Sequence, residues 1–290
     1  TMETDRSELC GCKGIRTCLK CEAIFNITPK YQPNLSVIEY ASVYCISCDR
    51  CWPGWNSVEH DKHIGEYKRL DGIHIIENFL TLDEESQLIN DLELLPWELS
   101  QSGRRKQNFG PKCNFKKKKL CMGNFKGFPK CTKFVHEKFK NIKLLKDFHT
   151  IEQCTLEYDP SRGASIDPHI DDCWIWGERI VTVNLMADTV LTLTPYKPDK
   201  NRYNHDFAPE EFKQINIELL QVVRIPLPRR SLIVLTGEAR YSWLHQIYRE
   251  DICSRRLCLA FREFTPAYLP GGEHSEEGKE ILKTGKQRWI

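Results

Sequence analysis

Short apolar segments alternate with polar turns through the second half of the chain. The segments are five to nine residues long, are rich in β-branched and aromatic residues, and are separated by Pro, Gly and polar clusters. They span residues 151–158, 179–187, 190–194, 218–225, 231–236, 243–248 and 256–264. This series of short strands predicts two sheets packed face to face as a barrel. Segment 195–216 opens with two prolines among polar residues and is expected to be a surface loop.

The last of these segments has two chemically different faces. Leu257, Leu259 and Phe261 alternate with Arg256, Cys258, Ala260 and Arg262. Because alternate residues of a strand point to opposite sides, both arginines share a face with small residues. Burying guanidinium groups there is costly unless an anion meets them, and arginine binds carboxylates through two parallel hydrogen bonds. The pattern is typical of a site for a dicarboxylate such as 2-oxoglutarate. The alternative interpretation is an edge strand whose two arginines are exposed to solvent and bind no ligand.

The first half of the chain and the C-terminus show helical patterns. Residues 71–76 predict a turn and a strand, after which Thr81 and Glu84 form a capping box at a helix start. Apolar residues then recur at helical spacing before Pro96, at Leu82, Leu88, Ile89, Leu92 and Leu95. Further helices are predicted at about residues 130–147 and 275–284, and the glycine-bounded segment 102–110 predicts a loop or short hairpin.

The composition is that of a globular protein. The chain has 290 residues, of which 40% are hydrophobic and 28% charged, enough for a sizeable core. Its polar start lacks the pattern of a secretory signal, and no apolar run approaches the length of a membrane span. The fourteen cysteines are therefore expected to be reduced thiols or metal ligands. These features predict a cytoplasmic and nuclear protein with no membrane partner.

Half of the cysteines lie in the first 55 residues at close spacing. They are Cys10, Cys12, Cys18 and Cys21, followed by Cys45, Cys48 and Cys51. Four thiolates hold zinc in a tetrahedron and stabilise a segment that has little core of its own. Seven cysteines exceed one such site and are too few for two all-cysteine sites. The prediction is a structural zinc held by four of the seven, with packed free thiols or an iron–sulfur cluster as alternatives.

A His-x-Asp pair and one distant histidine are the candidate catalytic centre. His169 and Asp171 follow a predicted strand, where spacing of two directs both side chains to the same side. With His245 from another strand they match the 2-His-1-carboxylate triad of non-haem iron(II) oxygenases, which leaves coordination positions open for an oxo-acid and dioxygen. For the pair alone, a polar strand end is the alternative. Because histidine must be neutral to bind a metal, iron affinity should fall on acidification.

On these residues the sequence resembles the AlkB family of iron(II)/2-oxoglutarate dioxygenases. The family's Tyr, Gly, Ile and His-x-Asp pattern is matched by Tyr158, Gly163, Ile166, His169 and Asp171, with the later histidine and two arginines in order. Segments 10–18, 102–107, 166–172, 176–179 and 225–228 resemble one branch of the family that carries a cysteine-rich N-terminal region. The resemblance covers nearly the whole chain.

The resemblance implies an α+β, mostly β fold with a double-stranded β-helix (jelly-roll) oxygenase core, flanking helices and a cysteine-rich, zinc-binding N-terminal extension. Four regions are expected. Residues 1–55 would form the zinc-binding region, 56–150 the helical part with the substrate-recognition segment, 151–266 the catalytic core, and 267–290 a tail.

The resemblance also assigns roles to single residues. His169, Asp171 and His245 would bind iron(II). Arg256 would bind the distal carboxylate of 2-oxoglutarate and Arg262 the carboxylate next to iron.

Further residues are expected to line the pocket or to support the ligands without binding iron. Tyr158 would hydrogen-bond the co-substrate, whereas Leu156 and Cys258 replace asparagines that are common in the family. Asp172 is expected either to accept a hydrogen bond from a ligand histidine or to be an exposed carboxylate. Trp174, Trp176 and Trp243 are expected to be pocket walls or core, with an aromatic cage that binds a methylated cation as the alternative.

Residues 104–150 are strongly basic, with 15 Lys/Arg and 2 Asp/Glu, although the whole chain has a net charge of only +2. In the AlkB family the matching region forms a lid, and Arg104, Arg105 and Lys106 are the candidate substrate-binding residues. Four aromatics interleave with the basic residues as candidates for stacking on bases: Phe109, Phe115, Phe125 and Phe128. The run 116–119 taken alone favours a solvated basic face.

Three functions remain open at this point. The resemblance favours oxidative removal of the methyl group from a monomethylated lysine in protein, with actin as substrate and actomyosin as the functional setting. The alternative is demethylation of N6-methyladenine in DNA, where the basic segment would bind phosphates and salt would weaken binding. A non-catalytic scaffold that recruits partners is the third, and the complete triad argues against it.

Overall fold

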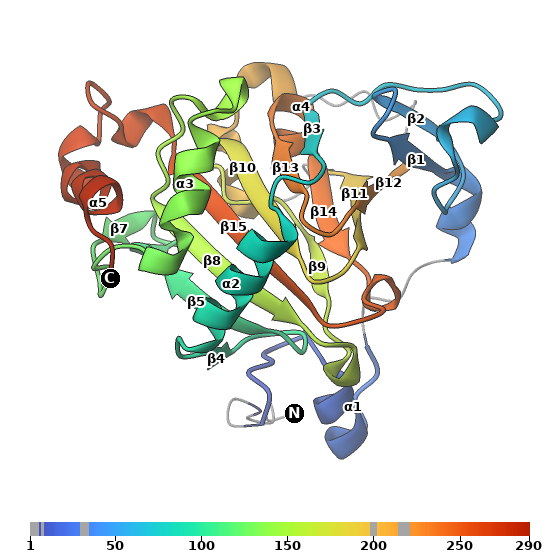
Figure 1. The fold of residues 1–290 in the computed structure, drawn as a ribbon, viewed down its shortest axis with the longest axis horizontal. Helices are drawn as coiled ribbons and strands as arrows, with labels where there is room; N and C mark the ends of the chain where they lie inside the picture. The colour runs from blue at the N-terminus through green and yellow to red at the C-terminus, as the bar shows by residue number, and fades with distance from the viewer. Residues whose placement is uncertain (1–5, 7–8, 30–34, 198–201, 214–220) are drawn as a thin grey trace.

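Two sheets stacked face to face form the centre of the molecule, with helices on the outside (Figure 1). This computed structural model describes Arg6 and residues 9–29, 35–197, 202–213 and 221–290. The predicted fold class is confirmed, because the core is a double-stranded β-helix flanked by helices.

The larger sheet has seven strands in the order β3-β13-β10-β15-β8-β5-β4. They are β3 (Ile73–Ile76), β13 (Leu232–Leu235), β10 (Trp176–Leu185), β15 (Arg256–Phe264), β8 (Glu152–Tyr158), β5 (Arg105–Phe109) and β4 (Glu98–Leu99). The smaller sheet has six, in the order β2-β1-β12-β11-β14-β9. They are β2 (Arg50–Pro53), β1 (Ala41–Cys45), β12 (Val222–Leu227), β11 (Thr189–Pro195), β14 (Trp243–Ile247) and β9 (Ile166–His169).

The remaining strands, β6 (Lys112–Asn114) and β7 (Lys119–Cys121), form a separate hairpin within the basic segment. The α-helices are α1 (Leu19–Phe25), α2 (Leu82–Glu93), α3 (Lys133–Phe139), α4 (Gly237–Tyr241) and α5 (Ser275–Gln287). Short 3-10 helices occur at Leu35–Tyr40, His60–Lys62, Lys130–Thr132, Lys143–Leu145, Pro160–Arg162, Arg202–Phe207, Glu210–Phe212, Arg249–Asp251 and Pro266–Tyr268. Among the described residues, none of the helices has the length and hydropathy of a membrane span.

Alternate side chains of β15 point to the outer face of the larger sheet and into the space between the two sheets. Leu257, Leu259 and Phe261 are fully buried on the outer face, where they pack with residues of α2 and α3. Burial of each such side chain stabilises the fold by roughly 2 kcal/mol. Arg256 and Arg262 instead line a cavity between the sheets, so the predicted division of the two faces is confirmed.

The start of α2 is held by the predicted capping box. The Glu84 backbone N–H donates to Thr81 Oγ1 at 3.1 Å, and the Thr81 N–H donates to Glu84 Oε2 at 2.8 Å. Leu88 and Leu92 of this helix are completely buried on the sheet. The helix therefore begins where the sequence predicts and serves as packing.

One local prediction in the first half of the chain is wrong, and a second is confirmed in one of its two forms. The helix expected at about 130–147 ends at Phe139, and an extended Ile142 separates it from the 3-10 turn at Lys143–Leu145. Phe139 and Leu145 enter the same core cluster from these two elements, so tertiary packing overrides the helical pattern. The loop or short hairpin expected at 102–110 is a hairpin, because β4 and β5 pair across the turn at residues 102–103. β5 also pairs with β8, and Gln107 donates to the Leu92 carbonyl at 2.8 Å.

The segment expected to be a surface loop at 195–216 is more structured. Residues 202–213 form two 3-10 helices, and the next subsection shows that they reach the site. Residues 198–201 and 214–216 lie outside the described residues, as do residues 218–220 of the strand predicted at 218–225. The described part of that strand is β12, which begins at Val222.

A buried histidine of α3 predicts how stability depends on pH. His136 packs edge-on against Phe261, with ring centroids 5.2 Å apart, and its Nε2 donates to Gln153 Oε1 at 3.1 Å. Burial lowers the pKa of His136 to about 4, from about 6.5 in the unfolded chain. The unfolded state therefore binds more protons between these values, and the free energy of unfolding should fall by up to about 3 kcal/mol as the pH drops through this window.

Urea unfolding of the wild type and of His136→Gln at several pH values between 7.5 and 4 measures this contribution. The variant should lose less stability on acidification than the wild type, and substitution of the exposed His74 by Gln is the matched control. Equal pH dependence in wild type and His136→Gln would contradict the assignment.

Candidate active site

The structure brings the three predicted iron ligands together at one edge of the smaller sheet. His169 ends β9 and pairs directly with His245 on the neighbouring β14, so the two rings lie 4.1 Å apart. Asp171 follows two residues after His169, and the ligand atoms of all three lie within 4.8 Å of one another. Antiparallel pairing of β9 and β14 therefore fixes the separation of the two imidazoles, as the strand positions predicted.

The histidines are held in the form that a metal requires. His169 Nδ1 lies 2.8 Å from the carbonyl oxygen of Asp167. A carbonyl only accepts, so Nδ1 carries the proton and Nε2 is left as the ligand atom. Burial lowers the pKa of both His169 and His245, more strongly for His245, which keeps both imidazoles neutral near pH 7.

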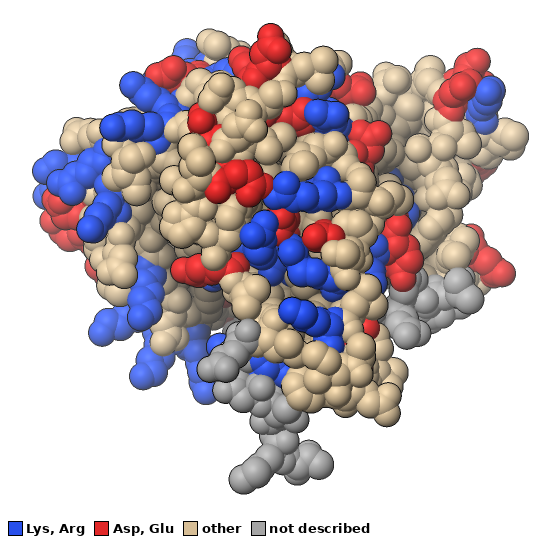
Figure 2. Space-filling model, turned by 60° about the horizontal axis from the view of Figure 1, so that its bottom comes forward, with Lys and Arg blue, Asp and Glu red and all other residues tan. Residues whose placement is uncertain are grey.

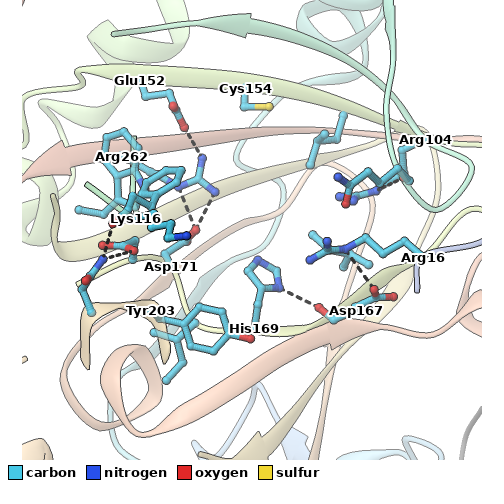
Figure 3. A pocket seen from close by; sticks show the side chains of 18 residues that line it. Arg16, Arg104, Lys116, Glu152, Cys154, Asp167, His169, Asp171, Tyr203 and Arg262 are labelled. Carbon is cyan, nitrogen blue, oxygen red and sulfur yellow. Dashed lines mark hydrogen bonds and ion pairs between the residues drawn. The ribbon is translucent and has the colours of Figure 1, made fainter. Parts of the chain in front are cut away.

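Asp171 is oriented by a guanidinium group from the opposite sheet. Arg262 donates from Nε at 3.1 Å and Nη2 at 2.9 Å to Asp171 Oδ1, and from Nη1 at 2.6 Å to Glu152 (Figure 3). Burial by itself raises the pKa of Asp171, but the electrostatic effects of Arg262, the two site histidines and Arg240 together outweigh it, so the pKa ends well below its usual range. The other oxygen, Oδ2, is buried and has no hydrogen-bond partner among the described residues, which is the condition expected of a carboxylate that binds a cation.

Arg256 supplies a second incompletely paired group deeper between the sheets. Its side chain is 1% exposed, it lies 4.8 Å from the ring of Tyr158, and its Nε donates to Asn184 Oδ1 at 2.6 Å. Its Nη1 is buried, and none of the described residues accepts a hydrogen bond from it. A buried cationic donor of this kind is costly unless an anion binds to it.

An inner cavity of about 60 Å³ connects these groups. Arg256 and Tyr158 line it together with the triad, and Leu156 and Cys258 contribute to its wall. A dicarboxylate that accepts from Arg256 at one end and reaches the metal ligands at the other satisfies both incompletely paired groups. The residues present therefore fit iron(II) and 2-oxoglutarate.

An outer cavity of about 650 Å³ opens from the triad toward solvent. Its wall combines charged and aromatic side chains from distant segments: Arg16, Arg104, Phe115, Lys116, Glu152, Asp167, Asp172, Trp176, Tyr203, Asn204 and Arg262. Figure 3 shows Arg16 and Arg104 on one side of His169, with Arg262 and Lys116 on the other. This cavity is large enough for a side chain or a base to approach the metal position.

The relatives of this chain include dioxygenases that depend on alpha-ketoglutarate (2-oxoglutarate), the co-substrate that fits the inner cavity. No family model matches the chain. An alpha-ketoglutarate-dependent dioxygenase of Mus musculus, alkB homolog 4, is 40% identical over 284 residues, which cover 94% of this chain and 93% of the relative. Its Homo sapiens counterpart is 41% identical over 94% of this chain and 92% of its own length. A DNA N6-methyl adenine demethylase of Caenorhabditis elegans is 31% identical over 97% of this chain and 96% of its own length.

The chain belongs to the AlkB family of iron(II)/2-oxoglutarate dioxygenases. It is therefore an enzyme of the dioxygenase and demethylase class rather than a scaffold. Iron(II) and 2-oxoglutarate are its cofactor and co-substrate, in agreement with the two incompletely paired groups of the site.

The predicted substrate-binding arginines of this AlkB dioxygenase lie in different environments. Arg104 lines the outer cavity. Arg105 points away and donates twice to Glu157, at 2.6 Å each, so the structure does not support a substrate contact for it. Lys106 pairs with Glu98 at 3.7 Å. Arg105 begins β5 and faces away from Arg104, a difference that the loop or short hairpin predicted for this segment did not specify.

Other expectations for the pocket are resolved by packing. Phe115 reaches the outer cavity, whereas Phe125 and Phe128 are buried in the core and Phe109 is half-buried. Trp176 lines the cavity, whereas Trp174 and Trp243 are core residues.

Asp172 takes neither of its two expected roles. It is half-buried, accepts from the Trp174 N–H at 3.0 Å and accepts from Asn204 Nδ2 at 2.8 Å. The backbone of Asp167 contacts His169 instead. Burial raises the pKa of Asp172, and these two neutral donors offset only part of that effect.

Several site residues were not predicted from sequence. Glu152 and Asn184 hold the two arginines, and neither has a motif that identifies it. Tyr203 and Asn204 line the cavity from the segment expected to be a surface loop, and Lys116 lines it from the run expected to be a solvated face. These contacts depend on long-range folding, so a local pattern carries no signal for them.

The first four cysteines form a buried cluster beside the catalytic site. Cys10, Cys12, Cys18 and Cys21 have ligand atoms within 4.8 Å of one another, and each is at most 6% exposed. Hydrogen bonding from Cys12 lowers the pKa of Cys18 to about 5, which favours a thiolate at the N-terminus of α1.

Two ion pairs attach this cluster to the catalytic core. Glu22 of α1 accepts from Arg249 at 2.7 and 3.0 Å, and Arg16 lies 3.3 Å from Asp167 at the cavity rim. Gly163, the glycine of the family pattern, has a φ of 61°, and a Cβ there would lie 2.6 Å from Leu19. A glycine at this position lets α1 approach the site.

The inner cavity predicts a specific effect of substituting Arg256. In Arg256→Lys the planar fork is lost, so the KM for 2-oxoglutarate should rise roughly tenfold or more, while iron(II) affinity stays unchanged because the triad is intact. Arg255→Lys is the matched control, since Arg255 pairs with Glu157 on the other face of the sheet. Steady-state kinetics and iron titration test this, and an unchanged KM in Arg256→Lys would refute the role.

Proposed function

We propose that this dioxygenase removes the methyl group from a monomethylated lysine in a protein, with actin as the substrate. Iron(II) and 2-oxoglutarate, when bound, supply oxidation of an N-methyl carbon by dioxygen, with succinate, carbon dioxide and formaldehyde released. The residues of the chain orient the triad, bind the co-substrate through Arg256 and hold the methylated group next to the metal ligands.

The observation that carries the proposal is the environment of Asp172 in the outer cavity. A methylated ammonium is recognised by an anionic or aromatic pocket. Asp172 accepts hydrogen bonds from two neutral groups, whereas Asp171 and Asp167 in the same wall are paired with arginines. Phe115, Trp176 and Tyr203 place aromatic rings in the same wall. A lysine-derived cation would meet the carboxylate of Asp172 together with these rings.

The rim and the outer surface suit an acidic protein as partner. Arg16, Arg104 and Lys116 stand at the cavity wall, and Figure 2 shows basic side chains outnumbering acidic ones toward the left of its view, on the side of β7 and α5. Complementary charge of this kind steers an acidic surface toward the pocket. Actin is acidic, which supports it as the substrate.

The second candidate is N6-methyladenine in DNA. The C. elegans relative is named as a DNA N6-methyl adenine demethylase, and it aligns along nearly the whole chain. The same basic rim would bind phosphates, and Phe115 and Trp176 would stack on a flipped base. A neutral base, however, gives the carboxylate of Asp172 no opposite charge.

The two candidates are separated by following the loss of one methyl group by mass spectrometry. Iron-loaded protein with 2-oxoglutarate is incubated with monomethyl-lysine actin and, in parallel, with N6-methyladenine DNA. Loss from actin supports the proposal, and loss from DNA alone reverses the ranking. His169→Ala and Asp171→Ala provide catalytically inactive controls and should abolish turnover on either substrate.

Asp172→Asn tests the carboxylate itself. The substitution keeps the shape and removes the charge, so the KM for a methyl-lysine substrate should rise about tenfold, while 2-oxoglutarate decarboxylation without substrate, which reports on the metal site, remains. Asp83→Asn, on the exposed start of α2, is the matched control. An unchanged KM in Asp172→Asn would remove the argument for a cationic substrate.

We also propose a structural zinc held by Cys10, Cys12, Cys18 and Cys21. With zinc–sulfur bonds of about 2.3 Å, tetrahedral geometry sets sulfur atoms about 3.8 Å apart, and the Sγ atoms of Cys18 and Cys21 are 3.9 Å apart. Arg6 donates to the Cys21 sulfur at 3.6 Å and to the Gly14 and Arg16 carbonyls at 2.7 and 3.1 Å. This zinc would fix the loop that carries Arg16 to the cavity rim.

Loss of this zinc should therefore affect substrate binding more than co-substrate binding. Cys21→Ser should lower zinc content and raise the KM for the protein substrate roughly tenfold, with the KM for 2-oxoglutarate unchanged. A tenfold change corresponds to about 1.4 kcal/mol, close to the contribution of one hydrogen bond to a charged group. Arg16→Ala should reproduce the kinetic effect with zinc retained, and Cys253→Ser, at an exposed cysteine, is the control. A Cys21→Ser protein with full zinc content would exclude this ligand set.

A further inference from the structure

Two of the remaining N-terminal cysteines lie beside two histidines at the far edge of the smaller sheet. Cys45 ends β1, and Cys48 lies in the turn that leads to β2. His60 begins the 3-10 helix at His60–Lys62, and His63 follows it directly. The spacing Cys-x-x-Cys followed by His-x-x-His brings four side chains of metal-binding type into one short stretch of chain.

The four side chains have the separations of a tetrahedral site. Their ligand atoms all lie within 4.8 Å of one another. The Sγ of Cys45 is 3.6 Å from Nδ1 of His60, against about 3.5 Å expected from zinc–sulfur and zinc–nitrogen bonds of about 2.3 and 2.0 Å at the tetrahedral angle. The rings of His60 and His63 are 5.4 Å apart and nearly perpendicular, so they approach a shared point from different directions.

Neighbouring residues hold these ligands in place. Trp52 stacks on His63 at 4.6 Å with an interplanar angle of 15°, and its Nε1 donates to the Cys48 sulfur at 3.4 Å. His63 Nδ1 is buried, and within the described residues it has no hydrogen-bond partner. A buried imidazole nitrogen without a partner is a second, independent sign that a ligand is missing from this position.

Cys51, the third cysteine of this segment, is excluded by the alternation of β2. Its side chain is completely buried in the main core cluster, and burial raises the pKa of its thiol to about 12. It therefore packs as a small apolar residue. Of the seven N-terminal cysteines, the first four form one cluster and Cys51 belongs to the core. The remaining two, Cys45 and Cys48, lie together with His60 and His63.

A metal at this position explains how the following segment is held. Residues 56–69 contain the 3-10 turn, and the one β-bridge that they make within the described structure joins Lys68 to Cys51. Val58 is 56% exposed and Ile64 84% exposed, so the segment contributes little apolar burial. A metal that links His60 and His63 to the hairpin would anchor this segment beside the edge strand β2 and restrict access to that edge.

We propose that Cys45, Cys48, His60 and His63 form a second, structural zinc site. Two thiolates and two imidazoles in tetrahedral arrangement favour zinc and leave no coordination position for substrate. The strand order of the smaller sheet places β2 and β1 at one end and β14 and β9, which carry the iron ligands, at the other (Figure 1). The site is therefore separate from the catalytic centre and from the cluster of four cysteines.

Zinc K-edge X-ray absorption and elemental analysis of the purified full-length wild type test the proposal. With both zinc sites occupied, two zinc ions per chain and an average shell of three sulfurs to one nitrogen are expected. One zinc with two sulfurs and two nitrogens would support this site while removing the four-cysteine site. A shell of sulfur alone would overturn the proposal, and this result does not depend on whether any variant folds.

The variant His60→Ala/His63→Ala assigns the ligands. It should lose one zinc per chain and the nitrogen part of the zinc shell, with iron content and 2-oxoglutarate decarboxylation unchanged. The matched control is His74→Ala/His149→Ala, which removes two exposed histidines elsewhere. Retention of the wild-type zinc content in His60→Ala/His63→Ala would overturn the proposal.

Discussion

The site depends on the ion pair between Asp171 and Arg262. Asp171 follows the last strand of the smaller sheet and Arg262 lies on a central strand of the larger one, so the pair connects the two sheets at the mouth of the barrel. Arg262 occupies one carboxylate oxygen and leaves the other free for a cation. Removing one partner of a buried pair costs about 3–5 kcal/mol, because the other charge is then uncompensated. The same contact thus stabilises the fold and orients the metal ligand.

The site consists of an inner co-substrate pocket, the metal ligands and an outer cavity. Arg256 forms the inner end, where Asn184 and Tyr158 hold it, and the two histidines lie between it and the outer cavity. The outer wall is assembled from segments far apart in sequence. Arg16 comes from the cysteine-rich region, Phe115 from the small hairpin and Tyr203 from the segment between β11 and β12. The co-substrate pocket and the metal ligands are therefore positioned by the two sheets. The wall of the outer cavity is formed by segments outside the sheets, and these contact the substrate.

This layering explains which features the sequence could predict. His169, His245 and the two inward arginines lie on strands whose period of two fixes their direction, and Asp171 follows two residues after His169, so a local pattern was enough. The helix at Leu82–Glu93 was equally local, because its capping box and apolar positions lie within one segment. Glu152, Asn184 and Tyr203 gained their roles from contacts with residues distant in sequence. Arg105 contacts Glu157 because β5 pairs with β8, a partner that the predicted loop or short hairpin did not identify. His60 and His63 were not predicted as metal ligands, because the sequence pattern considered the cysteines alone. Their proximity to Cys45 and Cys48 depends on the fold.

The most direct test of this account is anomalous X-ray scattering from crystals of the iron-loaded protein, measured on both sides of the iron and zinc absorption edges. The account predicts an iron peak bounded by His169 Nε2, Asp171 Oδ2 and an imidazole nitrogen of His245, with Arg262 still bound to Asp171 Oδ1. Iron located elsewhere, or Asp171 turned away from the metal toward Arg262 with both oxygens, would contradict it.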